Sequence, residues 1–178
     1  MNSDDYWRRL KDTDWLESVP PSQHDAFRIS VESALAGGRG PEALVTGEYD
    51  VECIEDDGDY TTLLEQYADA SYGKFRPESI DDDVDWESEI ATISFTLNGK
   101  HFERSFEQLS DYVSDEFDDT LNDILEEAGI QERFFQLPTD DQIAKLTFAK
   151  PETLRRAVEA GLLPQGVLMK NKGQEDDG

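Results

Sequence analysis

The segment from Glu89 to Phe106 constrains the fold more than any other part of the chain. Asn98-Gly99 is the dipeptide most typical of a two-residue type I′ turn, in which both residues have positive φ. The resulting hairpin has a mainly apolar face made by the pairs Leu97 with Lys100, Phe95 with Phe102, Ile93 with Arg104 and Ala91 with Phe106. Its polar face comprises Thr92, Ser94, Thr96, His101, Glu103 and Ser105. This alternation indicates an antiparallel sheet covered on one side only.

Apolar periodicity predicts further elements on both sides of this hairpin. Residues 133–148 predict a second hairpin around Pro138-Thr139-Asp140-Asp141, and stripes at helical spacing predict helices within residues 1–36, after Asp59, from Ser114 to Ala128 and after Pro151. Tyr49 to Cys53 alternate as a strand, whereas residues 71–84 have no clear period and predict a loop. We therefore expect an α+β fold in which one antiparallel sheet of two or more hairpins has helices packed on one face, with N-terminal helices added.

A chain of 178 residues is long enough for one such domain. We expect a single α+β domain over residues 1–164, with residues 1–40 as its helical N-terminal part. Residues 165–178 are polar, contain glycine and predict a frayed acidic tail.

The charge of the chain is strongly negative and unevenly distributed. It has 42 acidic and 16 basic side chains, a net charge of −26, and residues 41–89 alone hold 17 acids and 2 bases. Such a chain repels phosphate, which excludes a bare nucleic-acid binder. The excess of carboxylates has two interpretations. It creates an electrostatic field that attracts a basic partner, or it serves solubility and salt adaptation. Clustering favours the partner, because salt adaptation would coat all surfaces.

No motif with catalytic, metal-binding or cofactor-binding chemistry emerges. The Gly37-Gly38-Arg39-Gly40 stretch lacks the Lys-Ser/Thr of a phosphate-binding loop, and His24 and His101 are the only histidines. With Gly58 at the sixth position of an EF-hand loop, Cys53 falls at the first position and Leu64 at the twelfth, and neither residue can serve there. We therefore expect no enzyme, no catalytic residue, no cofactor and no dedicated metal site.

Features of the sequence also bear on its location. Cys53 is the only cysteine and cannot form an internal disulfide, and alternation with Tyr49 and Val51 predicts a buried, inert thiol. No apolar run is long enough to span a membrane, and no export signal is visible at the N-terminus. These features predict a cytoplasmic protein that does not engage a membrane.

Residues 71–164 contain several short stretches whose order along the chain is informative. They are Ser71-Tyr72-Gly73-Lys74-Phe75-Arg76-Pro77-Glu78-Ser79-Ile80, Ile93-Ser94-Phe95, Asn98-Gly99-Lys100, Leu121-Asn122, and Arg133-Phe134-Phe135 with Gly161-Leu162-Leu163-Pro164. Over residues 71–164 this pattern resembles small bacterial immunity-type proteins of polymorphic or contact-dependent toxin systems. The resemblance implies a cytosolic protein that blocks a toxin by binding it, and it carries over no catalytic residue.

These observations lead us to expect an acidic protein-binding module that presents carboxylates to a basic enzyme such as a toxin nuclease. The candidate partner-binding residues are Asp56, Asp57, Asp59, Asp81, Asp82, Asp83, Asp85 and Trp86. Trp86 has two interpretations, as an interface anchor beside the acids or as a residue packed at the hairpin entrance. Two alternative functions remain open: a nucleic-acid mimic that inhibits a DNA-binding protein, and a salt-adapted protein with no such partner.

Overall fold

The computed structural model describes residues 1–139 and 142–169. Within them, the strands are β1 (Gly47–Asp50), β2 (Glu78–Asp85), β3 (Ile90–Leu97), β4 (Lys100–Glu107), β5 (Arg133–Gln136) and β6 (Ile143–Ala149). The α-helices are α1 (Ser3–Lys11), α2 (His24–Ala36), α3 (Asp59–Asp69), α4 (Phe117–Glu127), α5 (Pro151–Glu159) and α6 (Gly166–Met169). Short 3₁₀ helices cover Trp15–Glu17, Pro21–Gln23 and Gly40–Glu42.

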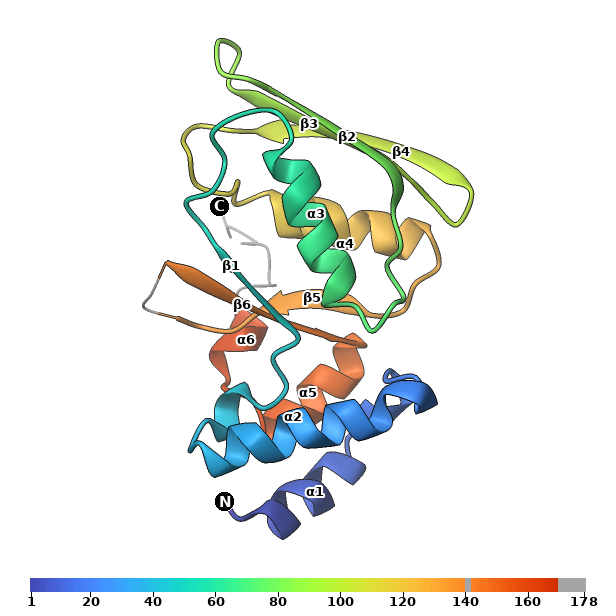
Figure 1. Ribbon diagram of the computed structural model, residues 1–178, viewed down its shortest axis with the longest axis vertical. Coiled ribbons are helices and arrows are strands. Elements are labelled where there is room, and N and C mark those ends of the chain that lie inside the picture. The colour runs from blue at the N-terminus through green and yellow to red at the C-terminus, as the bar shows by residue number, and fades with distance from the viewer. Residues whose placement is uncertain (140–141, 170–178) are drawn as a thin grey trace, which may run out of the picture.

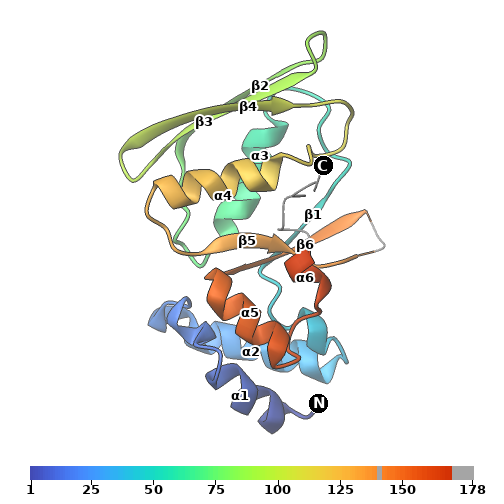
Figure 2. The same cartoon turned by 180° about the vertical axis from the view of Figure 1, so that it is seen from behind.

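The elements form a stack of alternating helical and sheet layers (Figures 1 and 2). From one end, the order is α1, then α2 with α5, then the sheet β1-β6-β5, then α3 with α4, then the sheet β2-β3-β4. All strand pairs are antiparallel, which confirms the predicted α+β class.

The hairpin β3–β4 forms with the predicted turn and register. Asn98 and Gly99 have φ angles of 52° and 77°, as a type I′ turn requires. Phe95 lies opposite Phe102, and the other three predicted pairs also form. The apolar face is buried, so the prediction of a sheet covered on one side is confirmed for this hairpin.

The second predicted hairpin also forms, as β5–β6, but it does not join the first in one sheet. β1 pairs with the other side of β6 and β2 pairs with β3, giving two three-stranded sheets. Both hairpins turn apolar side chains toward the layer of α3 and α4, and Phe95, Leu121 and Phe148 belong to one buried cluster there. Because that layer fills the space between the hairpins, their strands cannot pair with each other.

Strand β2 lies in the segment for which the sequence predicts a loop, and that prediction is wrong from Glu78 onward. Ile80, Asp82 and Val84 occupy alternate positions on its inner side, where Val84 is buried and Ile80 packs against the cluster around α3. The charged Asp82 in the middle of this side interrupts the apolar alternation, which explains why the strand period is not visible in the sequence.

The sheet β1-β6-β5 is buried on both faces. Ala144, Leu146 and Phe148 of β6 face the cluster around α3 and α4. On the other side, Phe135 of β5 joins a second cluster with Trp15 and other residues of the N-terminal helices and α5. This second core includes Val167 of α6, which is fully buried, so residues 165–169 correct the prediction of a frayed tail from residue 165. The rest of the predicted tail, and Asp140-Asp141 of the predicted turn, lie outside the described residues.

Candidate protein-binding face

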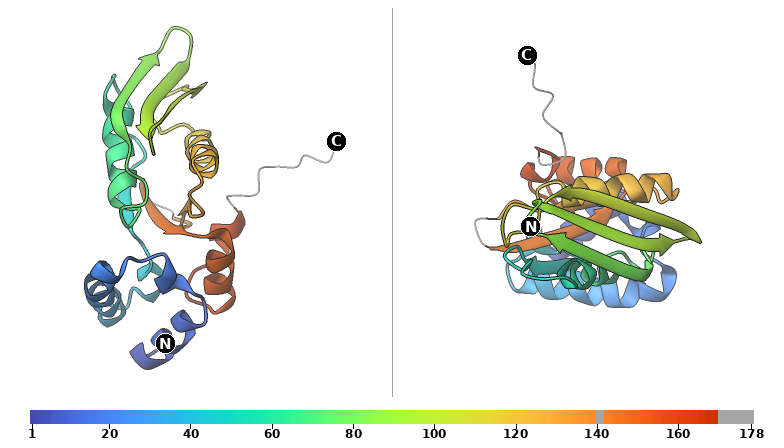
Figure 3. Two further views of the ribbon diagram at one scale, coloured as in Figure 1. Left: turned by 90° about the vertical axis from the view of Figure 1, so that its right-hand side faces the viewer. Right: turned by 90° about the horizontal axis from the view of Figure 1, so that it is seen from above.

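The sheet β2-β3-β4 has one face packed on helices and one outer face that no described helix covers, as the view from above shows (Figure 3). Side chains on this outer face alternate along each strand with the buried ones. The outer acidic face is the name used below for the exposed carboxylates of Asp81, Asp83 and Asp85 on β2 and Glu103 and Glu107 on β4, with β3 between them.

Strand register fixes how these carboxylates lie relative to one another. Asp81 pairs with Ser94, which pairs in turn with Glu103, so the acids flank a central strand of Thr and Ser side chains. Alternate residues on one strand lie about 6.7 Å apart, and strands two places apart lie about 9.5 Å apart. These separations are close to the Debye length of about 8 Å at physiological salt, so the carboxylates act partly as one field.

No Lys or Arg side chain lies on the outer side of these three described strands, and the one basic side chain there is His101. The two cations of β4, Lys100 and Arg104, lie on the inner register with Leu97 and Ile93. Both pair with Glu127 of α4, at 3.4 Å for Lys100 and 2.5 Å for Arg104. They therefore do not neutralise the outer acidic face.

Asp82 points to the other side of β2 and has a structural role. Its carboxylate accepts hydrogen bonds from the backbone N–H of Gly58 at 2.8 Å and of Thr61 at 2.9 Å. These N–H groups lie at the start of α3 and have no partner within the helix. Asp82 thus caps a helix that is distant in sequence and attaches it to β2.

Asp57 and Asp59 are engaged at the same junction. The Asp57 carboxylate accepts a hydrogen bond from the backbone N–H of Val84 at 2.8 Å, on the free edge of β2. The Asp59 carboxylate accepts from the backbone N–H groups of Glu55 and Asp56, each at 2.8 Å. Asp57 therefore attaches the segment before α3 to β2, and Asp59 holds the loop that leads into α3, so both carboxylates are engaged apart from the outer acidic face.

The turn between β2 and β3 adds apolar surface at one end of the outer acidic face. Trp86 in this turn is 43% exposed, and Ile90 at the start of β3 is 38% exposed. Asp85 accepts hydrogen bonds from the hydroxyl and N–H of Ser88 and from the N–H of Glu87, and these bonds lower the pKa of Asp85. Of the remaining candidates, Asp56 is exposed in the loop before α3.

Of the eight residues singled out in the sequence, four thus lie on or beside one surface: Asp81, Asp83, Asp85 and Trp86. Glu103 and Glu107 complete that surface and were not among the candidates. The sequence places Glu103 on the polar face of the β3–β4 hairpin. It does not predict that β2 is a strand that lies beside this hairpin.

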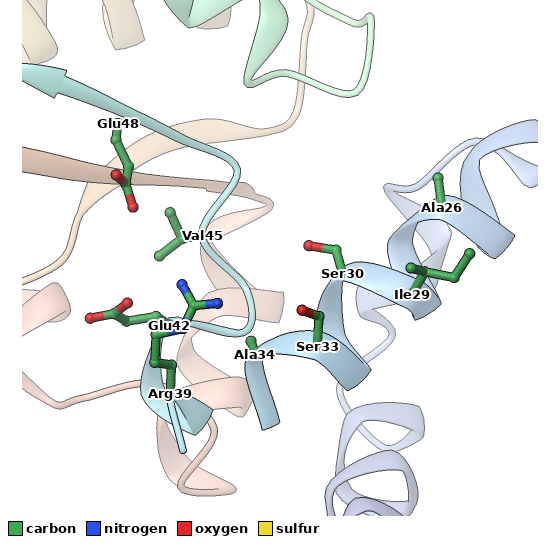
Figure 4. A pocket seen from close by; sticks show the side chains of 9 residues that line it. All are labelled: Ala26, Ile29, Ser30, Ser33, Ala34, Arg39, Glu42, Val45 and Glu48. Atoms are coloured by element: carbon green, nitrogen blue, oxygen red, sulfur yellow. The ribbon is translucent and has the colours of Figure 1, made fainter. Parts of the chain in front are cut away.

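Elsewhere, a hollow of about 500 Å³ lies between α2 and the segment that leads into β1 (Figure 4). Its charged lining residues are Arg39, Glu42 and Glu48, and Glu42 already pairs with Lys145 at 2.5 Å. The remaining side chains that line it are aliphatic or serine. The lining contains no histidine or cysteine, and one of its two carboxylates is already engaged in that ion pair.

A second hollow of about 430 Å³ lies beside a buried polar network. Tyr67 and Gln136 both donate hydrogen bonds to the Asp118 carboxylate, and Gln136 also donates to the Tyr49 hydroxyl at 2.7 Å. Burial raises the pKa of Tyr67, which keeps this hydroxyl protonated as a donor. The network joins β1, α3, α4 and β5, and we assign it to holding these layers together.

Among residues 1–139 and 142–169, no group of three or more His, Cys, Asp or Glu side chains is arranged to hold a metal ion. None of the described helices is both long and apolar enough to cross a membrane. Burial raises the pKa of Cys53 to about 11, so its thiol is protonated at neutral pH and is a poor nucleophile.

Comparison with protein-family models, curated proteins and solved structures finds no match to this chain. The resemblance to immunity-type proteins therefore remains an expectation from the sequence.

Proposed function

We propose that this protein is an acidic protein-binding module that acts in the cytoplasm, like an immunity protein, by occluding a basic partner through its outer acidic face. One observation supports the proposal above the others. Five carboxylates on two strands share a sheet face that carries no described Lys or Arg and that no described helix covers. A face of this kind attracts positively charged surfaces and repels phosphate.

The chemistry of the face indicates the class of partner. A basic enzyme, of which a toxin nuclease is one example, has a cationic cleft that complements rows of carboxylates. Trp86 and Ile90 add exposed apolar surface at one end of the face, and aromatic anchors of this kind contribute strongly to binding energy. Occlusion needs no catalytic residue on this chain.

The test uses two variants with the same change in net charge. The face variant carries Asp81→Lys and Asp83→Lys, and the control carries Glu65→Lys and Asp123→Lys, which are exposed on α3 and α4. A partner captured from a lysate of the source organism is immobilised, and association rates are measured from low to high salt. We expect the association rate for the native chain to fall steeply with salt, and the face variant to lose most of that dependence.

The control separates a specific face from general charge. An equal loss in both variants, or an association rate independent of salt, would contradict the proposal. The face variant alone losing binding would support it.

Salt adaptation is the second candidate, and one observation favours it. Exposed carboxylates also occur away from the outer acidic face, including Asp119, Asp123 and Glu126 on α4. A melting temperature that rises continuously to molar salt in both charge variants, with no partner captured, would support this candidate. The third alternative, a nucleic-acid mimic, would be favoured if the captured partner were a DNA-binding protein that DNA displaces.

A further inference from the structure

Each edge strand of the two sheets has outward backbone groups that other residues bond and outward groups that no described residue bonds. An edge strand presents unpaired N–H and C=O groups, which can pair with an added strand unless other groups cover them. This molecule has four edge strands among its described residues: β1, β5, β2 and β4.

On three of these edges, other residues bond one or two of the outward backbone groups. The Asn122 side chain of α4 accepts the N–H of Phe134 at 2.8 Å and donates to its C=O at 2.9 Å, which closes the edge of β5. Asp57 accepts the outward N–H of Val84 on β2. Directly after β1, the C=O of Val51 accepts a hydrogen bond from the N–H of Val113 at 2.7 Å.

On the fourth edge, β4, the bonded outward groups lie at Glu107 and Glu103. Lys100 flanks a two-residue turn and bonds to β3, so residues 101, 103, 105 and 107 direct their backbone groups outward. At Glu107 the N–H is bonded by the Glu116 carboxylate at 3.2 Å and the C=O by the Ser114 hydroxyl at 2.6 Å. Along the rest of the strand, the C=O of Glu103 accepts a hydrogen bond from Arg104 at 2.9 Å.

The outward groups that remain uncovered by described residues are the N–H and C=O of His101 and Ser105 and the N–H of Glu103. All three residues are exposed. We propose that this stretch of β4 receives an extended segment of the basic partner as a fourth strand of the sheet β2-β3-β4. The inference rests on the proposed function, because the same partner would lie across the outer acidic face.

Strand geometry also specifies the side chains of that segment. Residues of an added strand alternate between the two faces of the sheet. Those on the outer side would lie beside Glu103 and Glu107 and would carry positive charge. Those on the inner side would lie beside Lys100 and Arg104 and would be uncharged or acidic. The expected segment therefore alternates Lys or Arg with uncharged residues. A second copy of this chain fits less well, since each copy carries a net charge of −26.

The test uses two end-capped peptides as probes. The first alternates Lys with Thr and Val, and the second has the same sequence with N-methyl groups on the amides that would face β4. Affinity is measured by fluorescence anisotropy at low and high salt, and exchange of the Glu103 and Ser105 amides by NMR. We expect the first peptide to bind and to slow exchange of both amides, and the N-methylated peptide to bind about tenfold more weakly, because it loses backbone hydrogen bonds.

Matched variants of the protein address the edge directly. Ser105→Pro removes an outward N–H that β3 does not use, a change that an edge strand tolerates. Ser105→Ala keeps the backbone group and serves as the control. Thermal melts establish that both fold. We expect Ser105→Pro to weaken binding of the first peptide about tenfold and Ser105→Ala to leave it unchanged.

The outcomes distinguish this inference from the proposed function. Binding that ignores N-methylation and Ser105→Pro but is lost on reversing Asp81 and Asp83 would overturn the edge inference and leave the proposed function in place. Binding that depends on the backbone but not on salt or those acids would overturn the proposed function instead. No binding at low salt would overturn both. A dimer in light scattering that Ser105→Pro dissociates would assign the edge to a second copy and overturn the basic segment.

Discussion

The two sheets have the same number of strands and different surroundings. In β1-β6-β5, β6 reads Ile-Ala-Lys-Leu-Thr-Phe-Ala and is buried at five of its seven positions, because helices lie on both faces. In β2-β3-β4, β3 reads Ile-Ala-Thr-Ile-Ser-Phe-Thr-Leu and alternates between buried and partly exposed positions. A sheet buried on both faces must pair its polar groups internally, whereas a sheet with one open face can present charge to water or to a partner.

Truncation of a central side chain in the buried sheet provides the largest contrast. Phe148 of β6 is fully buried with its ring 4.6 Å from that of Phe134, and Phe148→Ala should reduce the free energy of unfolding by about 3–5 kcal/mol. Ser94→Ala, on the open face of β3, should change it by about 0.5 kcal/mol or less. Urea unfolding of both variants measures the difference. Similar losses would show that the open face is covered in solution.

Three consecutive aspartates of β2 provide the next contrast within one strand. Asp82→Ala removes the acceptor for two backbone N–H groups at the start of α3 and should cost about 2 kcal/mol. Asp83→Ala, on the outer acidic face, should cost nothing measurable or should stabilise slightly. The free energy of unfolding and amide exchange at Thr61 check both. Equal losses of stability in the two variants would mean that the inner and outer carboxylates of β2 do not differ in their structural role.

The sequence predicts the hairpins of both sheets because local signals specify them. Asn98-Gly99 specifies its own turn, and β-alternation specifies which face is buried. The sequence does not specify which sheet each hairpin joins, because that depends on where α3 and α4 lie, and their placement follows from contacts distant in sequence. Local sequence patterns therefore do not predict that the strands form two separate sheets.

The candidate site likewise has features that the local sequence predicts and features that depend on strand pairing. The acidic run at residues 81–85 is visible as composition, but its alternation between outer and inner sides requires knowing that it is a strand. Asp82 caps α3 from a position where strand alternation predicts an apolar residue. Its charge therefore interrupts the pattern by which β2 would be predicted. Glu103 lies on a face that the hairpin register predicts, yet its proximity to Asp81 and Asp83 depends on the pairing of β2 with β3.

A change of pH tests whether a charged side chain beside the buried sheet needs hydrogen-bonding partners. Glu132, just before β5, is 3% exposed. Burial acts to raise its pKa, but hydrogen bonds from Lys74 and Ser18 outweigh burial and hold the pKa below its ordinary value of 4.5. A lowered folded-state pKa contributes stability that is present above the unfolded-state pKa and is lost as pH falls through the folded-state value.

Glu132→Gln should therefore cost about 1.5 kcal/mol at pH 7, through loss of charge-assisted hydrogen bonds, and less as the pH falls below 4.5. Glu103→Gln, on the open face, should change stability by only about 0.3 kcal/mol at pH 7. Unfolding free energies from pH 7 to 3 measure both. A cost for Glu132→Gln that persists unchanged at the lowest pH would contradict the ion pair.

The smallest expected effect concerns the outer acidic face itself. Asp81 and Asp83 are one alternate step apart on β2 and repel each other, so Asp81→Asn with Asp83→Asn should raise the free energy of unfolding by about 0.3 kcal/mol at low salt. The gain should vanish near 1 M salt, where the Debye length is about 3 Å. Denaturation at several salt concentrations checks this. An increase in the free energy of unfolding would mean that the two carboxylates destabilise the fold at low salt. Their favourable contribution must then come from contacts with another molecule. A loss at every salt concentration would place them among the groups that stabilise the sheet and would remove the distinction between its two sides.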